Sequence, residues 1–421
     1  MASKIKIKTE LPGPKAKELF ENKFNKYMGL VALPYPFIYG GNGEGCYVHD
    51  ADGNVFLDFV SQIAAQPLGY NHPRMVKVLE RYVGKAPLKL AGHDFYPEEH
   101  AHMIEKIANI TPEGLNCTFL VNSGAEAVEN AMKICYRKRP AAKIAISIEG
   151  AFHGRTLGAL SLTNSKAVHK KNYPELPVRH VPWSKDGIAT VQAMENIVHR
   201  DVSPENIAFI IFEPIQGEGG YRIPEPAFFK RLEEFAKKHG IPLIADEIQS
   251  GMGRTGKWFA FQHFDIKPDL ITMAKALQVG ATITTQEMFP TEGGAISSTF
   301  GGGDLISMAT GLEIIKIIEE ENLLPHVEKM GNYLLKKLKE LELKYPTFVK
   351  DARGLGLMCA IDVPDHDMQE KVVRECYERG LLLLGCGFNG LRFIPPYIVT
   401  EEEIDVAMNI LESIIKCIVK K

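Results

Sequence analysis

The stretch IAFIIFEPIQGEGGYRIPEPAFFKRLEEFAKKHGIPLIADEI, residues Ile207–Ile248, decides the predicted fold. It opens with an apolar run, continues with an amphipathic helical pattern from about Pro226, and closes with a second apolar run that ends at Asp246. Buried strands joined by a helix are typical of parallel pairing, because parallel neighbours need a long crossover connection. The stretch therefore predicts two parallel strands with a helix between them.

The same alternation continues on both sides of this stretch. From about Asn116, short apolar runs alternate with helical patterns such as AEAVENAMKICYRK. The expected strands are CTFLV, KIAISIE, RHVPW, IAFIIFE, IPLIADEI and DLITMA. Apolar strands that alternate with helices predict an α/β fold, with a mostly parallel sheet flanked by helices on both faces.

The two ends of the chain predict a second, smaller domain. The stretch 45–59 alternates like a hairpin around a turn, and the chain after about Leu305 is strongly helical before it gives short strands and a final helix. A chain of 421 residues also exceeds one typical core. We expect a large domain over 60–310 and a discontinuous α+β domain formed by 1–59 and 311–421.

Composition narrows the class of function. Hydrophobic residues make up 45% of the chain and charged residues 24%, and the net charge of −3 gives no electrostatic reason to expect nucleic acid or an anionic membrane as a partner. No apolar run approaches the roughly 18 residues of a spanning helix. The seven cysteines include no C-x-x-C pair and predict reduced thiols, so we expect a cytoplasmic protein.

Polar side chains follow several of the predicted strands, at the sheet edge where open parallel sheets bind ligands. The stretch 122–126 (NSGAE) can be a helix cap, with Ser123 as the capping residue, or a phosphate site; both can hold together. Phe152, His153 and Arg155 follow the next strand, where an aromatic ring could stack on a flat ligand and an arginine could bind a carboxylate. Glu218 lies in a glycine-rich turn.

Asp246 and Lys275 end two further strands. An unpaired carboxylate at Asp246 would be costly, so it forms an ion pair, caps a helix, or keeps a buried ring nitrogen protonated. Ile248 would share its face if the strand continued, and Gln249 follows as a hydrogen-bond donor. Burial lowers the pKa of a lysine and makes its amine a nucleophile or base, although a surface lysine is the commoner case.

Together these residues predict a cofactor site. An anion site, a stacking aromatic, a strand-end acid and a strand-end lysine are what pyridoxal phosphate requires. The stretch 93–102 contains histidines and glutamates but lacks the H-E-x-x-H spacing, so no metal is expected. The glycines at 41–45 do not open a helix after a strand and are not a dinucleotide fingerprint.

The chain resembles class III (ω-amino acid) aminotransferases, which are fold type I pyridoxal phosphate enzymes, and among them the 4-aminobutyrate, ornithine and lysine 6-aminotransferases. The resemblance extends over nearly the whole sequence. It rests on GNVFLDFVSQIAAQPLGYNHP, VNSGAEAVENAMK, GAFHGRTLGALSLT, EPIQGEGGY, IADEIQSGMGRTGKWFAF, PDLITMAKAL, SSTFGGGD, ARGLGLMCAI and GLRFIPP.

The resemblance implies a role for each matching position. Lys275 would form the Schiff base with the cofactor, and Asp246 would pair with its pyridine nitrogen. Ile248 and Phe152 would enclose the ring, and Gln249 would bind its phenolic oxygen. The implied cofactor-binding residues are Ser123, Gly124, Ala125, Phe152, His153, Asp246, Ile248, Gln249, Lys275 and Thr299. Thr299 would come from a partner subunit, which implies a homodimer.

The resemblance also implies substrate contacts. Arg392 would bind a carboxylate, with Glu218 as its switch partner, while Arg155 would hold the far carboxylate and Ile63 would line the pocket. The segment between Lys275 and Thr299 is shorter than is usual in the family, and two residue patterns also depart from it. Ala-Leu-Gln-Val-Gly replaces the glycine-rich stretch after the lysine, and Gly303 replaces an asparagine. They lean toward lysine 6-aminotransferases and related ω-transaminases and racemases.

The predicted function is therefore a ping-pong ω-aminotransferase. It would move the terminal amino group of 4-aminobutyrate, ornithine or lysine to 2-oxoglutarate. Alternatives are an acetylornithine-type aminotransferase, an amino-acid racemase on the same scaffold, and a non-catalytic pyridoxal phosphate-binding or interaction protein. The racemase would need a second acid on the other face of Cα, and the sequence identifies none.

Overall fold

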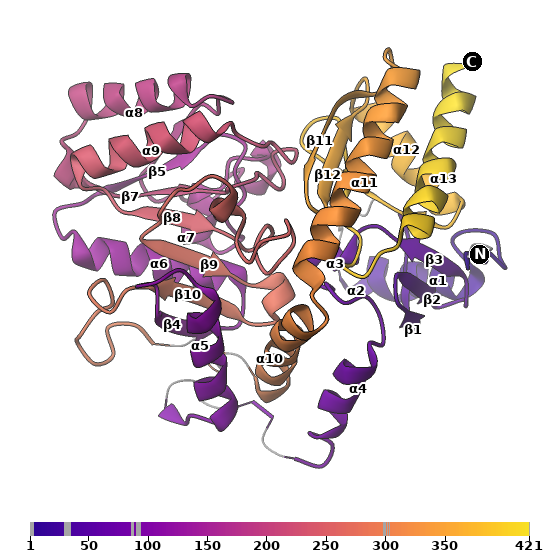
Figure 1. Ribbon diagram of the computed structural model, residues 1–421, viewed down its shortest axis with the longest axis horizontal. Helices are drawn as coiled ribbons and strands as arrows, with labels where there is room; N and C mark the ends of the chain where they lie inside the picture. The colour runs from indigo at the N-terminus through magenta and orange to yellow at the C-terminus, as the bar shows by residue number, and fades with distance from the viewer. Residues whose placement is uncertain are drawn as a thin grey trace. The chain divides into compact units, whose positions relative to one another are not determined.

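The computed structural model describes residues 4–28, 35–85, 88–89, 94–297, 300, 302 and 304–420. The chain forms two compact units (Figure 1). The terminal unit consists of Met1–Val76 and Pro325–Lys421, and the central unit of Lys77–Leu324.

A seven-stranded sheet forms the middle of the central unit. Its strands β6, β5, β7, β8 and β9 are parallel neighbours, which confirms the predicted α/β class. All six expected strands are present. In order across the sheet the strands are β4 (Cys117–Val121), β10 (Gly280–Thr284), β9 (Leu270–Met273), β8 (Leu243–Asp246), β7 (Ile207–Phe212), β5 (Ile144–Ile148) and β6 (Val178–Val181).

Strand β10 was not predicted. It runs antiparallel to both β4 and β9, and it returns almost immediately after β9. Its sequence GATIT contains a glycine and two threonines and so lacks the apolar run that marked the other strands, yet every residue of it is buried. Its interior position, between two neighbours, is what makes it a strand.

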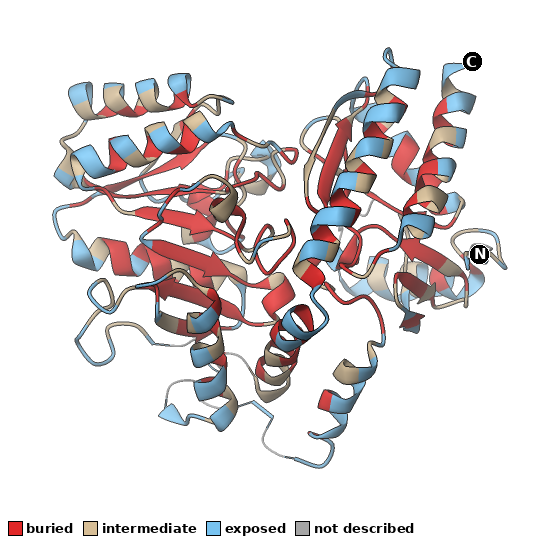
Figure 2. Ribbon diagram, viewed as in Figure 1, coloured by how far each residue is buried: buried red, intermediate tan, exposed pale blue. Residues whose placement is uncertain are grey.

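The helix α9 (Pro226–His239) joins β7 to β8 as the sequence predicts. Pro226 stands in the first turn, where a backbone N–H would have no helical partner, and Gly240 ends the helix with φ 60°, a conformation that favours glycine. The buried face of α9 includes Phe228, Phe229 and Leu232. Figure 2 shows the same pattern throughout the central unit, with buried strands and helices buried along one face.

Helices cover the two faces of this sheet. In Figure 1, α8 and α9 lie together on one side of the strands and α6 on the other. The helices of the central unit are α5 (Glu98–Ile110), α6 (Gly124–Lys138), α7 (Leu157–Leu162), α8 (Ile188–Arg200), α9 and α10 (Leu305–Glu320).

The central unit extends beyond residue 310 to the end of α10. This helix packs against α5, and Lys106 forms an ion pair with Glu319 at 2.6 Å. At Gly311 a Cβ atom would lie 2.2 Å from the carbonyl oxygen of Leu277, so the backbone of α10 approaches the turn after β9 closely. These contacts assign α10 to the central unit.

The terminal unit joins the two ends of the chain through a sheet. The predicted hairpin is present as antiparallel β2 and β3, and β3 pairs in parallel with β13 from the C-terminal part. One sheet has the order β1 (Tyr39–Glu44), β2 (Tyr47–Asp50), β3 (Val55–Asp58) and β13 (Leu381–Leu382). The other has the order β11 (Lys350–Leu355), β12 (Met358–Asp362), β15 (Gly390–Phe393) and β14 (Leu384–Cys386).

The terminal unit also contains most of the C-terminal helices. Its longest helix, α11, begins at the border with the central unit. The helices are α1 (Pro14–Leu19), α2 (Asn25–Tyr27), α3 (Ser61–Ala64), α4 (Pro73–Glu80, at the border), α11 (Leu323–Lys344), α12 (His366–Glu378) and α13 (Glu401–Val419). Across the part of the chain that the structure describes, no helix combines the length and apolarity needed to cross a bilayer.

We predict that Gly280→Ala destabilises the protein by about 1–3 kcal/mol, because a Cβ there would lie 2.3 Å from the carbonyl oxygen of Ser123 and force β10 away from β4. Gly293→Ala is the matched control, since a Cβ at Gly293 meets no atom within 4 Å. Urea unfolding of both variants measures the effect. Equal midpoints for the two variants would show that the sheet tolerates the extra methyl group.

Candidate active site

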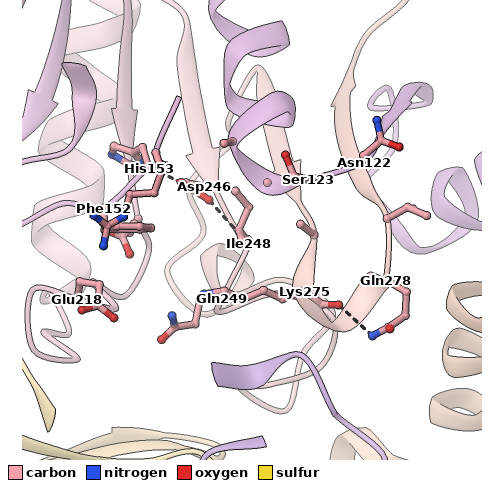
Figure 3. Close-up of a pocket in the computed structure, with 17 residues that line it drawn as sticks. Asn122, Ser123, Phe152, His153, Glu218, Asp246, Ile248, Gln249, Lys275 and Gln278 are labelled. Atoms are coloured by element: carbon pink, nitrogen blue, oxygen red, sulfur yellow. Dashed lines mark hydrogen bonds and ion pairs between the residues drawn. The ribbon is translucent and has the colours of Figure 1, made fainter. Parts of the chain in front are cut away.

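A cavity of about 380 Å³ lies at the carboxyl ends of five strands of the central sheet. Segments that follow β4, β5, β7, β8 and β9 each contribute side chains to it (Figure 3). Its lining residues are Asn122, Ser123, Gly124, Ala125, Phe152, His153, Gly154, Arg155, Glu213, Glu218, Asp246, Ile248, Gln249, Ala274, Lys275, Gln278 and Val279. The structure therefore brings together most of the residues that the sequence singled out.

One wall of the cavity is the N-terminus of α6. Ser123 caps the helix, its Oγ accepting from the N–H of Glu126 at 3.3 Å. In the predicted capping box, the carboxylate of Glu126 would accept from the N–H of Ser123. Its Oε2 instead accepts from the N–H of the preceding residue, Asn122, at 2.9 Å. The helix dipole and N–H groups at this end favour an anion. At Gly124 a Cβ would lie 2.8 Å from Cδ1 of Ile248, so glycine allows these segments to approach.

Asp246 also lines the cavity and is only 4% exposed. Its Oδ2 is 2.7 Å from Nδ1 of His153, and its Oδ1 accepts from the hydroxyl of Thr272 at 3.2 Å and from the N–H of Ile248 at 3.1 Å. Strand β8 ends at Asp246, so the turn after it, and not continued strand alternation, carries Ile248 to the cavity. These three partners offset the cost of burying the carboxylate.

Lys275 opens a short 3-10 helix, η6 (Lys275–Leu277), directly after β9. Its φ of 41° lies in the left-handed region, which costs a non-glycine residue roughly 1–2 kcal/mol. Such strain is typical of functional sites. The side chain of Gln278 donates from Nε2 to the carbonyl oxygen of Lys275 at 3.1 Å. Gln278 also lines the cavity, in the stretch that departs from the family pattern.

Glu213 is a cavity residue that the sequence analysis missed. It follows β7, and its two oxygens accept from the N–H of Phe152 at 2.9 Å and from the N–H of Gly217 at 2.8 Å. Burial, together with the charge of Asp246, raises the pKa of this carboxyl to about 7, although His153 and the two N–H donors act in the other direction. A glutamate directly after an apolar run is the same signal that identified Asp246.

The predicted substrate residues are divided between the two units. Arg155 and Glu218 line the cavity of the central unit. Ile63 is 39% exposed, and Arg392 is buried on β15; both belong to the terminal unit, and their roles in substrate binding stay predictions. Thr299 lies outside the described residues.

The chemistry of this set fits pyridoxal phosphate. The N-terminus of α6 suits a phosphate, Asp246 suits a protonated ring nitrogen, and Lys275 supplies an amine in the same cavity. Within the described part of the chain, Oε1 of Gln249 and Nε2 of His153 are buried and have no hydrogen-bond partner. Buried polar atoms of this kind are usually satisfied by a ligand or water. The described residues contain no group of three metal-ligating side chains that could bind a metal ion.

Comparisons with known proteins give a family match and several relatives over most of the chain. The family model for class-III aminotransferases matches residues 34–415. The chain is 32% identical to an alanine/serine racemase of Pyrococcus horikoshii, covering 98% of this chain and 92% of that one. It is 36% identical to an acetylornithine aminotransferase of Archaeoglobus fulgidus (88% and 93% covered) and 34% identical to a probable 4-aminobutyrate aminotransferase of Bacillus subtilis (88% and 91% covered).

A solved structure extends the similarity to three dimensions. The lysine aminotransferase of M. tuberculosis superposes with a TM-score of 0.88 at 30% identity. The match covers 96% of this chain and 99% of that one.

We predict that Glu247→Gln flattens the pH dependence of stability between about pH 4.5 and 7. Glu247 is 1% exposed, and burial raises its pKa from 4.5 to about 7. The folded state therefore binds this proton more tightly than the unfolded state, so the stabilisation is complete below pH 4.5 and is lost as the pH rises through 7. The difference between the two proteins can reach about 3 kcal/mol.

The neutral amide preserves the local contacts. Glu247 accepts from the N–H of Phe261 at 2.8 Å and from the hydroxyl of Ser250 at 2.7 Å, and a glutamine oxygen and nitrogen can replace these two atoms because the hydroxyl can rotate to accept. Unfolding free energies of both proteins at pH 5 and pH 8 give the measurement. Parallel pH profiles would contradict the assignment of this proton to Glu247.

Proposed function

This chain belongs to the class-III aminotransferase family, and we propose that it transfers the terminal amino group of an amino acid to 2-oxoglutarate. It is an aminotransferase with pyridoxal phosphate as its cofactor. The donor that we propose first is 4-aminobutyrate, with ornithine and lysine next. The products would be a semialdehyde and glutamate.

The side chains of the cavity would have different roles in this reaction. When bound, pyridoxal phosphate supplies an aldehyde for the substrate amine and a ring that accepts electrons. We assign to Lys275 the covalent attachment of the cofactor and, once its amine is released, the removal of the proton from the substrate carbon that bears nitrogen. Asp246 would keep the ring nitrogen protonated, and His153 would orient the Asp246 carboxylate.

The observation that carries the proposal is the presence of Glu218 in the same cavity as Lys275. An amino acid that reacts at its terminal amine brings no carboxylate to the reacting end, so an acidic side chain there can neutralise a carboxylate-binding arginine. 2-Oxoglutarate needs that arginine to be available, because its α-carboxylate is a bidentate partner. The family resemblance gives this arginine as Arg392, and Arg155 would hold the far carboxylate of 2-oxoglutarate.

The proposal includes two further elements that rest on the sequence. One is a homodimer in which Thr299 of the second copy completes the phosphate site. The other is a cytoplasmic location, which we infer from the composition and the cysteine pattern.

A second candidate is amino-acid racemisation. It is favoured by the 32% identity to the alanine/serine racemase over nearly the whole chain. Racemisation requires protonation of Cα from either face, and Lys275 can serve only one of them. An acetylornithine-type aminotransferase is the corresponding alternative within the transaminases, and the A. fulgidus relative favours it.

A donor screen tests these functions against one another. Glutamate formation from 2-oxoglutarate is measured with 4-aminobutyrate, ornithine, lysine and acetylornithine, and exchange of enantiomers of alanine and serine is measured without an oxo acid. We expect glutamate with a donor that carries a terminal amine. Exchange of enantiomers with no glutamate from any donor would replace the transaminase proposal by the racemase.

We expect Lys275→Ala to abolish the visible absorbance of lysine-bound cofactor and to lower turnover about 10³-fold or more, because no other amine would attach the cofactor and move the proton. Lys267→Ala is the control, since this exposed lysine lies outside the cavity. Absorbance spectra and single-turnover rates give the measurement. Persistence of the band in Lys275→Ala would show that another lysine holds the cofactor.

A further inference from the structure

Arg155 lines the cavity and contacts two rings, those of Phe152 and His169. Its guanidinium carbon is 5.3 Å from the centroid of the Phe152 ring, a cation–π distance. His169, at the end of the 3-10 helix η3 (Ala167–His169), is edge-on to the same Phe152 ring, with centroids 5.9 Å apart and planes at 80°. His169 was not among the residues that the sequence analysis identified, because no motif or strand end marks it.

The contact between His169 and Arg155 requires one protonation state of the imidazole. Nε2 of His169 is 3.3 Å from Nη2 of Arg155, and a guanidinium donates only, so Nε2 must accept. The ring is then neutral and carries its proton on Nδ1. That atom is 3.3 Å from Oγ of Ser165, which can accept the proton. Ser165, His169 and Arg155 thus form one directed chain of hydrogen bonds.

The charges around His169 favour the same state. The charged groups that act on its ring are Arg155, Lys166 and Glu218. Burial, followed by the positive charges of Arg155 and Lys166, lowers the pKa of His169 from 6.5, and Glu218 acts in the opposite direction. The imidazole is therefore neutral at pH 7, and protonation at lower pH would place a second cation against Arg155.

We propose that neutral His169 is a positioning residue that orients Arg155 for the distal carboxylate of a dicarboxylic substrate. This inference rests on the proposed function, in which Arg155 binds that carboxylate. One N–H of Arg155 is used by His169, and the remaining N–H donors of the fork stay available for a bidentate carboxylate. Protonation of His169 removes the acceptor, so Arg155 loses its fixed orientation and dicarboxylates bind more weakly.

Equilibrium binding of two unreactive ligands tests the proposal. Glutarate carries two carboxylates and pentanoate one on a chain of equal length, and binding of each to the cofactor-loaded enzyme is followed by the change in cofactor absorbance between pH 5.5 and 8. We expect His169→Phe to weaken glutarate about 3- to 10-fold at pH 8 with little effect on pentanoate, which corresponds to the loss of one hydrogen bond. His169→Gln, which retains an uncharged acceptor, should restore wild-type affinity there.

The pH dependence separates orientation from mere packing. As the pH falls below 6.5, the ordinary pKa of histidine, the wild type should lose glutarate affinity relative to His169→Gln, whose acceptor does not titrate. The ligand and the cofactor titrate in the same way in all variants. A difference between the pH profiles of the wild type and His169→Gln therefore comes from His169. His199→Gln removes an exposed histidine of α8 and should keep the wild-type profile. An identical pH profile for wild type and His169→Gln, or equal weakening of both ligands in His169→Phe, would overturn the proposal.

Failure of the proposed function would look different. Suppose that no donor yields glutamate, but His169→Phe still weakens glutarate more than pentanoate. The proposal that the protein transfers a terminal amino group would then be wrong, while the role of His169 would stand. If the wild type binds glutarate no better than pentanoate at pH 8, Arg155 does not bind a distal carboxylate, and both the assignment of Arg155 and the role of His169 are wrong.

Discussion

The hydrogen bond between His153 and Asp246, 2.7 Å long and buried at the end of the central sheet, is the interaction on which the site depends. A carboxylate in the interior is stable only if its desolvation is offset by donors. Here the donors come from three places: an imidazole after β5, a hydroxyl on β9 and a backbone N–H after β8. The donors that offset the burial of Asp246 therefore also fix the relative positions of three strand ends.

Glu213 and Glu247 extend this arrangement to the neighbouring loops. Glu213 binds the backbone of the loops after β5 and β7, and Glu247 binds the backbone at Phe261. Asp246 and Glu247 are consecutive, so their side chains project in different directions, one toward the cavity and the other into the loop that follows β8. Acidic side chains thus accept hydrogen bonds from loop N–H groups around the cavity in which we propose that the reaction takes place.

Much of the fold could be predicted because burial leaves a clear mark on parallel strands. Six strands appear as apolar runs, and the polar residues that follow them indicated Asp246 and Lys275 before any geometry was known. Strand β10 has no such run. It is a strand because it pairs with β4 on one side and with β9 on the other. Glu213 follows an apolar run just as Asp246 does, but the sequence analysis did not identify it. The glycine-rich turn that comes after it indicated Glu218 instead.

His169 could not have been found in this way. Its importance comes from a ring contact with Phe152 and a hydrogen bond to Arg155, and neither is encoded in spacing along the chain. The extent of α10 in the central unit is a similar case. Helical periodicity gives the helix, but only packing against α5 and the turn after β9 decides which unit it joins.

The short return from Lys275 to β10 has a consequence for how proteins of this architecture can diversify. Four residues separate Lys275 from Gly280. Lys275 and Gln278 have positive φ, and Gly280 rests against the carbonyl of Ser123. An insertion or deletion here would shift the register of β10 against β4 and displace the end of the sheet that carries Ser123 and the N-terminus of α6. Selection can therefore alter this part of the cavity by exchanging side chains, as at Gln278, while its length stays fixed.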